Sequence, residues 1–286
     1  MMAAETKHTV YEGAELQSFR FYLQYSGEHT AVLRVLQKHL PGEFQRIAAD
    51  KNSLGVLGVG SGGGELDVEM LSLLLSAFPT LSITVDIVEA SAELVANFKA
   101  LVAKSDNLQK IPFTWHFMMS QEYRKQVNNA KKYDFIHMIQ MIYFVDDLTE
   151  TIRFYHSILK KNGTLLIIIE KTTSGWDILW RTFSKELCTE ACPVYRSSDD
   201  VVAAVKTLGL KYVEHIIPNK FNITECFDPN SETGRCLLRF LTGAEFASFT
   251  PQIRSDILNL LRGKCSTEKE GKIIFNSCLS CIFVYA

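Results

Sequence analysis

A glycine-rich stretch, GVLGVGSGGGELDVEM, spans residues 55–70 and constrains the fold of this chain more than any other feature. Six of its first ten residues are glycines, and the apolar residues Val56, Leu57 and Val59 stand among them. Glycine loses more backbone entropy on folding than any other residue, so such a cluster indicates that the backbone here approaches another group closely. A strand-like run opens the stretch and a helix-like run closes it. We therefore expect a strand, a tight loop and a helix, with a ligand lying against the loop.

Strand-like and helix-like segments alternate along the first 170 residues. Apolar runs predict strands at 54–60, 81–91, 113–119, the beginning of 133–145, and 164–171. Periodic patterns predict helices at 64–78, 92–105 and 148–163, the last of them stopped by Asn162-Gly163. The run at 164–171 is apolar on both faces, as in a buried parallel strand. This alternation predicts an α/β fold with a doubly wound, mostly parallel sheet.

The remaining segments extend this core at both ends. Residues before about 50 are expected to be helical, 198–210 a helix, 211–218 a strand and 271–286 one long final strand. The last two strands are expected to close the sheet edge as an antiparallel pair, giving seven strands in all. The intervening segment 219–263 is too long for a turn and is expected to form helices that cap a pocket. We expect one domain, 1–286, made of an N-terminal helical cap segment (1–50), a cofactor-binding core (51–170) and a C-terminal part with cap insertions (171–286).

Composition excludes several classes of function. Apolar residues make up 47% of the chain and charged residues 22%, with a net charge of −2, which is ordinary for a globular protein. No block of basic residues is present, so nucleic acid is not an expected partner. The apolar runs are too short for a membrane span, and the N-terminal residues lack the apolar core of a signal peptide. We expect a cytoplasmic protein.

The seven cysteines are scattered through the second half of the chain. Their odd number and wide spacing favour reduced thiols. Cys278 and Cys281 form a C-x-x-C pair, but they lie on a predicted strand, where residues three apart point to opposite faces. No metal site is therefore expected.

The glycines also fit the dinucleotide pattern G-x-G-x-x-G at Gly58, Gly60 and Gly63. The acidic residue of that pattern follows after about 20 residues, whereas Glu89 follows Gly60 by 29. Glu89 does lie at the end of a predicted strand, where a carboxylate can accept both hydroxyls of a ribose. The spacing is long for a nicotinamide cofactor and leaves another adenosine cofactor open.

Four segments resemble, in the same order, the motifs of S-adenosylmethionine-dependent methyltransferases. They are VLGVGSGGG with its glycine loop, IVEAS with its ribose-binding acid, YDFIHMIQMIYFVDD at the fourth strand, and LKKNGTLLIIIE at the fifth. Gly58 stands where the first motif commonly has an acid. This resemblance covers residues 55–170 and implies the class I methyltransferase fold, which is Rossmann-like, with S-adenosyl-L-methionine as cofactor.

A narrower resemblance covers nearly the whole chain. SGEHTAVLRVLQKHLPG, SGWDILW, LGLKY and KIIFNSCLS are similar to segments of the histamine N-methyltransferase family, which includes relatives that methylate carnosine. The resemblance implies methyl transfer to an imidazole ring nitrogen of a small amine such as histamine or carnosine, carnosine giving anserine. It implies cofactor contacts at Gly58, Gly60, Gly62, Glu89, Ser120 and Ile139. It implies substrate contacts at Glu28, Gln140, Tyr143, Phe144, Trp176, Trp180, Phe240 and Ser277.

The chain departs from the family at four positions. Leu94 replaces a glutamine expected near the adenosine, Thr9 and Glu15 stand where aromatic residues are expected near the substrate, and Ser277 replaces a substrate-binding asparagine. Three of these positions are on the substrate side. The resemblance therefore leaves methyl transfer intact while leaving open which imidazole compound is methylated.

The expected chemistry needs orientation more than acid or base catalysis. A sulfonium methyl group is already activated, and neutral imidazole, with a pKa of about 6.5, offers a lone pair at pH 7. No catalytic residue is therefore assigned, and His29 and His137 are interpreted as structural or incidental. Gln140 suits the orienting role because its amide both donates and accepts hydrogen bonds. Glu28, in the first turn of a predicted helix, could hold an alkylammonium group or the imidazole N–H.

Two alternatives remain at this level. The glycine pattern also fits an NAD(P)-dependent oxidoreductase, and the substrate-side departures fit a non-catalytic binding protein on the methyltransferase scaffold. The expected partner is a small imidazole compound, and the expected state is a monomer.

Overall fold

The computed structural model describes residues 12–127, 131–189, 192 and 194–286. Thr9, one of the positions that departs from the family pattern, lies outside the described residues. Contacts between residues divide the chain into two compact units. The first unit comprises the described part of Met1–Ala31 together with Glu170–Asp199 and Ile216–Leu279, and the second comprises Val32–Ile169, Asp200–His215 and Ser280–Ala286.

The second unit is built on a seven-stranded sheet with the strand order β3-β2-β1-β4-β5-β10-β6. The neighbouring pairs β1–β2, β1–β4, β2–β3 and β4–β5 are parallel. Crossing over between parallel neighbours requires helices, and these alternate with the strands as predicted. The strands are β1 (Ser53–Val59), β2 (Ser82–Val88), β3 (Phe113–His116), β4 (Tyr133–Ile139), β5 (Leu159–Glu170), β6 (Lys211–Ile217) and β10 (Leu279–Tyr285).

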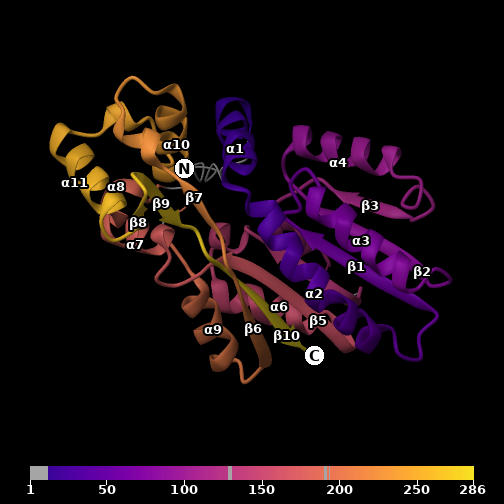
Figure 1. Ribbon diagram of the computed structural model, residues 1–286. Coiled ribbons are helices and arrows are strands. Elements are labelled where there is room, and N and C mark those ends of the chain that lie inside the picture. Colours follow the sequence, from indigo (N-terminus) through magenta and orange to yellow (C-terminus); the bar gives the residue numbers. More distant parts are fainter. Residues whose placement is uncertain (1–11, 128–130, 190–191, 193) are drawn as a thin grey trace, which may run out of the picture. The chain divides into compact units, whose positions relative to one another are not determined.

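Helices cover both faces of this sheet (Figure 1). On one face, Phe44 of α2 packs edge-on against Phe135 of β4, and α3 lines a small space over the same strands. On the other face, buried residues of α5, α6 and α9 join the sheet in one apolar cluster. The predicted doubly wound architecture is confirmed. The helices concerned are α2 (Glu28–Ala48), α3 (Glu65–Ala77), α4 (Ala92–Lys104), α5 (Ser120–Val127), α6 (Leu148–Ser157) and α9 (Ser198–Thr207).

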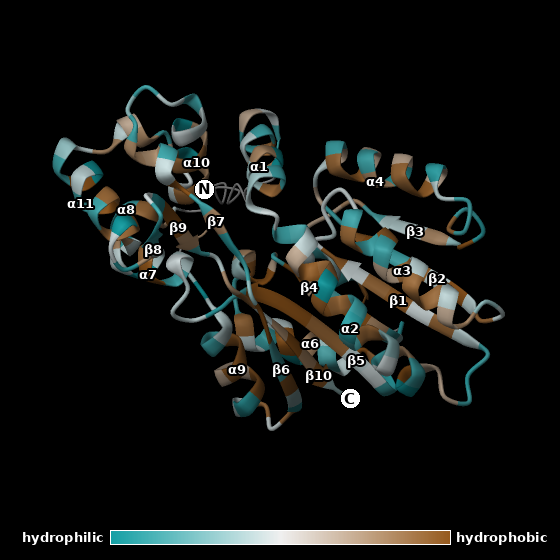
Figure 2. Cartoon of the chain, viewed as in Figure 1, coloured by the Kyte–Doolittle hydropathy of each residue, from teal (hydrophilic) through white to brown (hydrophobic). Residues whose placement is uncertain are grey.

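Strand β5 lies next to the middle strand of the sheet and is largely apolar. Its last eight residues are all buried, and it stands out as a hydrophobic strand in Figure 2.

A buried carboxylate, Asp134, lies near the beginning of β4. Its oxygens accept hydrogen bonds from Lys51 Nζ and Lys160 Nζ, each at 2.7 Å, and from the Gly55 backbone N–H at 2.8 Å. Burial alone would raise the pKa of Asp134, but these three donors outweigh it and hold the pKa below its usual value.

The first unit combines helices with a small antiparallel sheet of order β7-β9-β8. A cluster of buried apolar residues that is rich in aromatic rings forms its core. Its elements are α1 (Gly13–Ser26), α7 (Gly175–Thr182), α8 (Ser184–Leu187), α10 (Glu232–Thr242), α11 (Pro251–Arg262), β7 (Lys220–Asn222), β8 (Ser266–Lys269) and β9 (Lys272–Asn276), with the 3-10 turns η2 (Thr224–Phe227) and η3 (Phe246–Ser248).

Two predicted elements were wrong in their extent. The helix expected over 148–163 ends at Ser157, and Asn162-Gly163 lies inside β5. Asn162 adopts φ +63°, so this pair bends the strand and does not stop a helix. The single final strand expected over 271–286 is two strands in different sheets, because the chain leaves the small sheet after Asn276 and enters the large one at Leu279.

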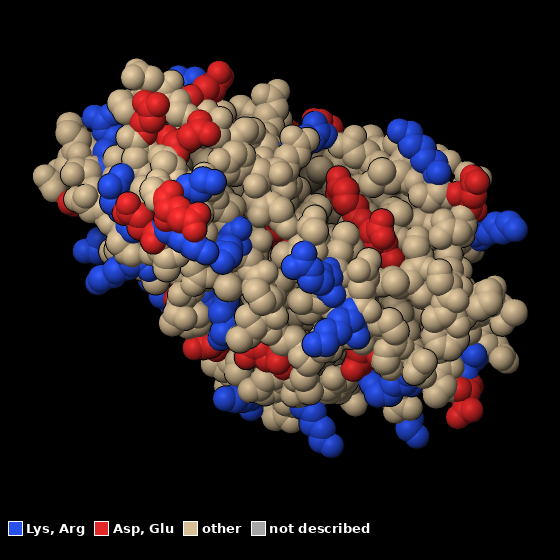
Figure 3. Space-filling view, viewed as in Figure 1, with Lys and Arg blue, Asp and Glu red and all other residues tan. Residues whose placement is uncertain are grey.

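Other observations concern the surface and the thiols. Basic and acidic side chains are interspersed on the face drawn in Figure 3. All seven cysteines are thiols, and burial raises the pKa of Cys226, Cys265 and Cys281 to about 12. Within the described ranges, no helix is both long and apolar enough to cross a bilayer. Within the same ranges, no group of three or more His, Cys, Asp or Glu side chains could hold a metal ion.

Candidate active site

The glycine loop of the second unit follows β1 directly. Gly60, Gly62 and Gly64 adopt φ values of +64°, +59° and +83°, a conformation that favours glycine. A Cβ at Gly60 would lie 2.7 Å from Met141 Cβ, and one at Gly64 would lie 2.1 Å from a ring carbon of Phe98. At Gly62, by contrast, a Cβ would meet nothing within 4 Å. The loop is thus packed on two sides and open at Gly62.

Glu89 follows β2 and closes the loop. Its Oε2 accepts the Gly62 N–H at 2.9 Å, and its Oε1 accepts the Ser91 N–H at 2.9 Å. A carboxylate has about four acceptor positions, and the Ala90 backbone N–H also bonds to this one, so at least one position remains for a ligand. Burial raises the pKa of Glu89 above its usual value, although the backbone donors at Ser91 and Gly62 oppose the shift. Glu89 therefore lies beside the open side of the loop, where the sequence predicts it.

A buried polar cluster that the sequence analysis did not identify supports the loop from behind. Asp67 Oδ1, in the first turn of α3, accepts the Ser61 hydroxyl at 2.9 Å and lies 3.0 Å from His137 Nε2 of β4. Asp67 is 3% exposed and His137 is 2% exposed. A Cβ at Gly58 would lie 2.3 Å from Ser61 Oγ and 2.8 Å from Asp67 Oδ1. Gly58 therefore makes room for an acid that comes from α3, in place of the acid that the first motif commonly carries at this position.

The end of β4 presents the other predicted residues of this unit. Ile139 ends the strand, and Gln140 follows with φ +52° and donates its backbone N–H to Ile168 O at 2.9 Å. The rings of Tyr143 and Phe144, in the 3-10 turn η1 (Ile142–Phe144), meet edge-on with centroids 4.6 Å apart. Left-handed backbone at a non-glycine residue is uncommon and concentrates at functional sites.

Ser120, the remaining predicted cofactor contact, begins α5. It is buried, and its hydroxyl lies 2.9 Å from the Tyr155 hydroxyl. All six predicted cofactor residues thus lie in the second unit. The glycine loop and Glu89 are joined directly, whereas Ser120 begins the helix α5 and Ile139 ends the strand β4.

The first unit joins Glu28 to an aromatic cluster through Tyr22, a residue that the sequence analysis missed. Glu28 is 4% exposed, and its Oε2 accepts the Tyr22 hydroxyl at 2.7 Å. The Tyr22 ring stacks on Phe240 with centroids 4.2 Å apart and meets Trp176 edge-on at 5.7 Å. Burial and the Glu28 carboxylate raise the pKa of Tyr22 well above its usual value, so Tyr22 remains a donor. Spacing gave no signal for Tyr22, which lies on α1 before the break at Gly27.

Trp180 and Trp176 contact different residues. Trp180 Nε1 donates to Leu241 O at 3.0 Å, and the Trp180 ring stacks on Tyr195 with centroids 5.9 Å apart. Trp176 instead meets Phe240 and Phe275 edge-on, with centroids 5.8 and 5.7 Å away. The two tryptophans share the helix α7 but contact different rings.

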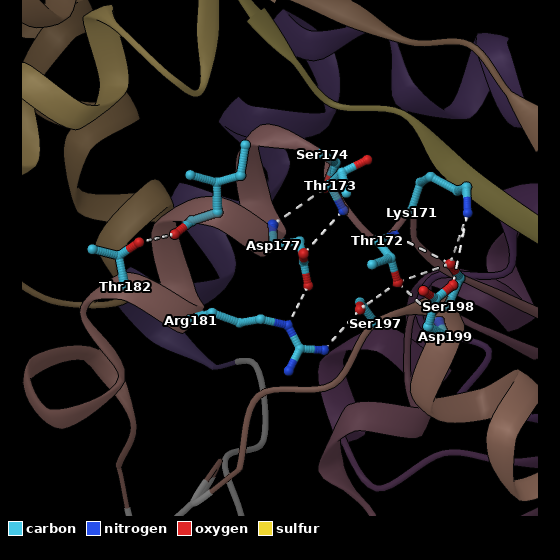
Figure 4. A network of polar contacts seen from close by, with 11 residues as sticks. Lys171, Thr172, Thr173, Ser174, Asp177, Arg181, Thr182, Ser197, Ser198 and Asp199 are labelled. Carbon is cyan, nitrogen blue, oxygen red and sulfur yellow. Dashed lines mark hydrogen bonds and ion pairs between the residues drawn. The ribbon is translucent and has the colours of Figure 1, made fainter.

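Local hydrogen bonds around Ser174, Asp177 and Arg181 set the start of α7 (Figure 4), the helix that carries Trp176. The Ser174 hydroxyl caps the helix by accepting the Asp177 N–H at 3.3 Å. The Asp177 carboxylate accepts the Thr173 N–H at 2.9 Å and the Arg181 Nε–H at 2.6 Å, and Arg181 reaches Ser197 Oγ at 3.0 Å. A serine followed three residues later by an acid is a known helix-start pattern. These hydrogen bonds thus hold the start of α7, and with it Trp176, in place.

Ser277 lies between β9 and β10 and is fully buried. Its backbone N–H donates to Asn219 O at 3.1 Å, one residue beyond the Lys220–Asn276 pair of the small sheet. The substrate residues predicted from the sequence therefore divide between the units. The first unit holds Glu28, Trp176, Trp180, Phe240 and Ser277, and the second holds Gln140, Tyr143 and Phe144.

Comparison with known proteins assigns the chain to a protein family. The methyltransferase domain family matches residues 32–215. Histamine N-methyltransferase of Xenopus tropicalis is 39% identical over 275 residues, covering 94% of each chain. The chain belongs to the histamine N-methyltransferase family. Carnosine N-methyltransferase 2 of Gallus gallus is 38% identical over 273 residues, covering 93% of this chain and 85% of that one.

A solved structure agrees with this assignment at the level of the fold. The plantazolicin methyltransferase BpumL in complex with SAH superposes with a TM-score of 0.50 at 13% identity, covering 96% of this chain and 91% of that one. The chain has the class I methyltransferase fold and is an S-adenosylmethionine-dependent N-methyltransferase. Nothing in these comparisons supports the nicotinamide alternative.

Proposed function

We propose that this protein transfers a methyl group from S-adenosylmethionine to an imidazole ring nitrogen of a small amine, histamine or the dipeptide carnosine. Family membership over nearly the whole chain carries the proposal. The observation in the structure that supports it is the buried Glu28 carboxylate, which accepts the Tyr22 hydroxyl beside the aromatic rings of Trp176 and Phe240. A carboxylate among aromatic faces suits a flat, partly cationic ligand.

The cofactor residues are proposed to act through the shape of the loop. The open side at Gly62 leaves the backbone accessible, and Glu89 retains at least one acceptor position for the ribose hydroxyls. Gly58 and Gly60 would keep the loop in the required form, while Ser120 at the start of α5 and Ile139 at the end of β4 would contact the cofactor. These features fit S-adenosylmethionine, which supplies the methyl group as an activated sulfonium.

The substrate residues are proposed to orient the imidazole. Gln140 would hold one ring nitrogen, and Glu28 would pair with the alkylammonium or with the ring N–H. The substrate residues of the second unit would include the rings of Tyr143 and Phe144, and those of the first unit would include the rings of Trp176, Trp180 and Phe240 together with Ser277. In the transfer, the lone pair of the ring nitrogen forms the new N–C bond, the S–C bond breaks with its electron pair remaining on sulfur, and the other ring nitrogen loses its proton to solvent. Because the methyl group is activated, alignment of the nitrogen supplies most of the catalysis.

A turnover screen tests this function directly. The protein is incubated with methyl-labelled S-adenosylmethionine and, in parallel, histamine, carnosine and imidazole compounds of similar size. We expect label in an N-methylimidazole product for at least one compound. The matched variant Glu28→Gln keeps the shape of the side chain and removes its charge. It should lower kcat/KM by at least about tenfold while S-adenosylhomocysteine affinity stays unchanged. Absence of any methylated imidazole, with normal cofactor binding, would favour the non-catalytic alternative.

We further propose that the protein acts as a monomer in the cytoplasm. Cysteines that are thiols, three of them with pKa values raised to about 12, fit a compartment that keeps thiols reduced. Size-exclusion chromatography with light scattering at micromolar concentration tests the oligomeric state.

A further inference from the structure

Among the buried polar side-chain atoms of the first unit that have no hydrogen-bond partner in the described residues are Trp176 Nε1, Asn219 Nδ2 and Ser277 Oγ. Buried polar groups are almost always paired, and leaving one unpaired costs about 1–3 kcal/mol. An indole N–H and an amide NH₂ can only donate, and a hydroxyl can donate as well. The three atoms thus share one requirement, which is a hydrogen-bond acceptor.

The contacts of these residues place all three around the same end of β9. Asn219 and Ser277 face each other across a backbone hydrogen bond of 3.1 Å that continues the β7–β9 pairing. Trp176 meets Phe275 edge-on, and Phe275 lies two residues before Ser277 in the chain. A Cβ at Gly175 would lie only 2.6 Å from Cε2 of the Phe275 ring, so α7 packs closely against β9.

The same contacts lead from these donors to the buried carboxylate. Trp176 meets Tyr22, whose hydroxyl donates to Glu28. The first unit therefore carries an acceptor in Glu28 and a set of donors around Ser277, with aromatic rings between them. A ligand that matches this arrangement carries a cation or N–H at one end and an anionic acceptor at the other.

We infer that the substrate is an imidazole compound that bears a carboxylate, of the carnosine kind, and that Asn219, Ser277 and Trp176 donate hydrogen bonds to that carboxylate. The inference rests on the proposed function and narrows it. Histamine offers an ammonium and a ring but no carboxylate, so it leaves the donors unpaired. A site built to bond a polar group discriminates strongly against an analogue that lacks it. Ser277 is also shorter than the asparagine expected from the family, which leaves room for the larger compound.

The test compares carnosine with β-alanylhistamine, which is carnosine without its carboxylate. For the wild-type protein we expect kcat/KM to be about ten- to hundredfold higher with carnosine, the range for hydrogen bonds to a charged group. Three variants each remove one donor: Asn219→Ala, Ser277→Ala and Trp176→Phe. Each should lower the ratio of kcat/KM for carnosine to kcat/KM for β-alanylhistamine about tenfold, because only carnosine carries the carboxylate. Asn259→Ala, which changes an exposed asparagine of α11 in the same unit, serves as the control and should alter neither.

Specific results would overturn the inference. A wild-type preference for β-alanylhistamine, or equal losses on both compounds in the Asn219 and Ser277 variants, would show that these donors do not bind a carboxylate. If neither compound is methylated, the proposed function fails. The dissociation constants of the two compounds, measured by calorimetry in the presence of S-adenosylhomocysteine, then still test the carboxylate contact. Equal dissociation constants would refute it.

Discussion

Gly60 offers the most direct test of how the cofactor loop is held. Its φ of +64° costs any other residue about 1–2 kcal/mol, because the left-handed region crowds a Cβ. A Cβ there would also lie 2.7 Å from Met141 Cβ and 2.8 Å from Met141 Cγ, close enough to force that residue to move. Overpacking of this kind adds about 1–3 kcal/mol. Gly60→Ala should therefore lower the free energy of unfolding by about 2–5 kcal/mol.

Gly209 provides a matched control with the same backbone strain and no clash. Its φ is +67°, and a Cβ would meet nothing within 4 Å. Gly209→Ala should therefore cost only about 1–2 kcal/mol. The difference between the two variants isolates the contact with Met141, which follows Gln140 at the end of β4.

The two variants should also differ in cofactor binding. Moving Met141 disturbs both the glycine loop and the end of β4, so Gly60→Ala should weaken S-adenosylhomocysteine binding at least about tenfold, or 1.4 kcal/mol. Gly209→Ala should bind normally. Denaturant unfolding and titration calorimetry measure the two quantities. Equal losses of stability, or normal binding by a folded Gly60→Ala protein, would refute the reasoning.

Three further changes test other parts of the second unit. Glu89→Ala should weaken S-adenosylhomocysteine binding by about 1.5–3 kcal/mol. Burial raises the pKa of Glu89, so this side chain takes up a proton at a higher pH than an ordinary glutamate does. As pH falls, calorimetry on the wild type should show S-adenosylhomocysteine binding weaken already at this higher pH; a flat profile would contradict this. Asp67→Ala leaves Ser61 and His137 without their acceptor and should cost about 1–3 kcal/mol of stability and weaken cofactor binding, whereas an unchanged melting temperature would exclude a supporting role. Asp134→Asn should cost about 1–3 kcal/mol at pH 7. The pKa of Asp134 is lowered by folding, so its contribution is present above the unfolded pKa and is lost as pH falls through the lower folded value. The wild type and this variant should therefore converge in stability in strong acid, as pH-dependent thermal melts would show.

Much of the large sheet could be predicted because its signals are local. The glycine cluster, the apolar run of β5 and the acid after β2 each identify an element from its own residues, and the strand order then follows from connection rules. The errors arose where tertiary pairing overrides a local signal. Asn162-Gly163 has the composition of a helix stop, but pairing with β4 carries the strand through it.

The candidate site was less accessible to sequence reasoning. Ser61, Asp67 and His137 come from a loop, a helix and a strand, and only their packing behind Gly58 makes them a group. Tyr22 precedes Glu28 across a helix break, so no helical spacing connects them. Asn219 stands in a loop between two strands and acquires meaning only from its hydrogen bond with Ser277. Long-range pairing of single polar residues leaves no periodic trace.

The left-handed backbone at Gln140 limits how this position can evolve. Holding a glutamine at φ +52° costs on the order of 1–3 kcal/mol, which a glycine would recover at the loss of the amide. Asparagine tolerates the same φ but is shorter by one methylene group, so its amide falls short of the point that glutamine reaches. Every replacement that relaxes the chain therefore withdraws the polar group, and every longer polar residue keeps the strain. On the proposed role of Gln140 in orienting the imidazole, substitutions that relax this backbone should give proteins that fold more easily and methylate less well.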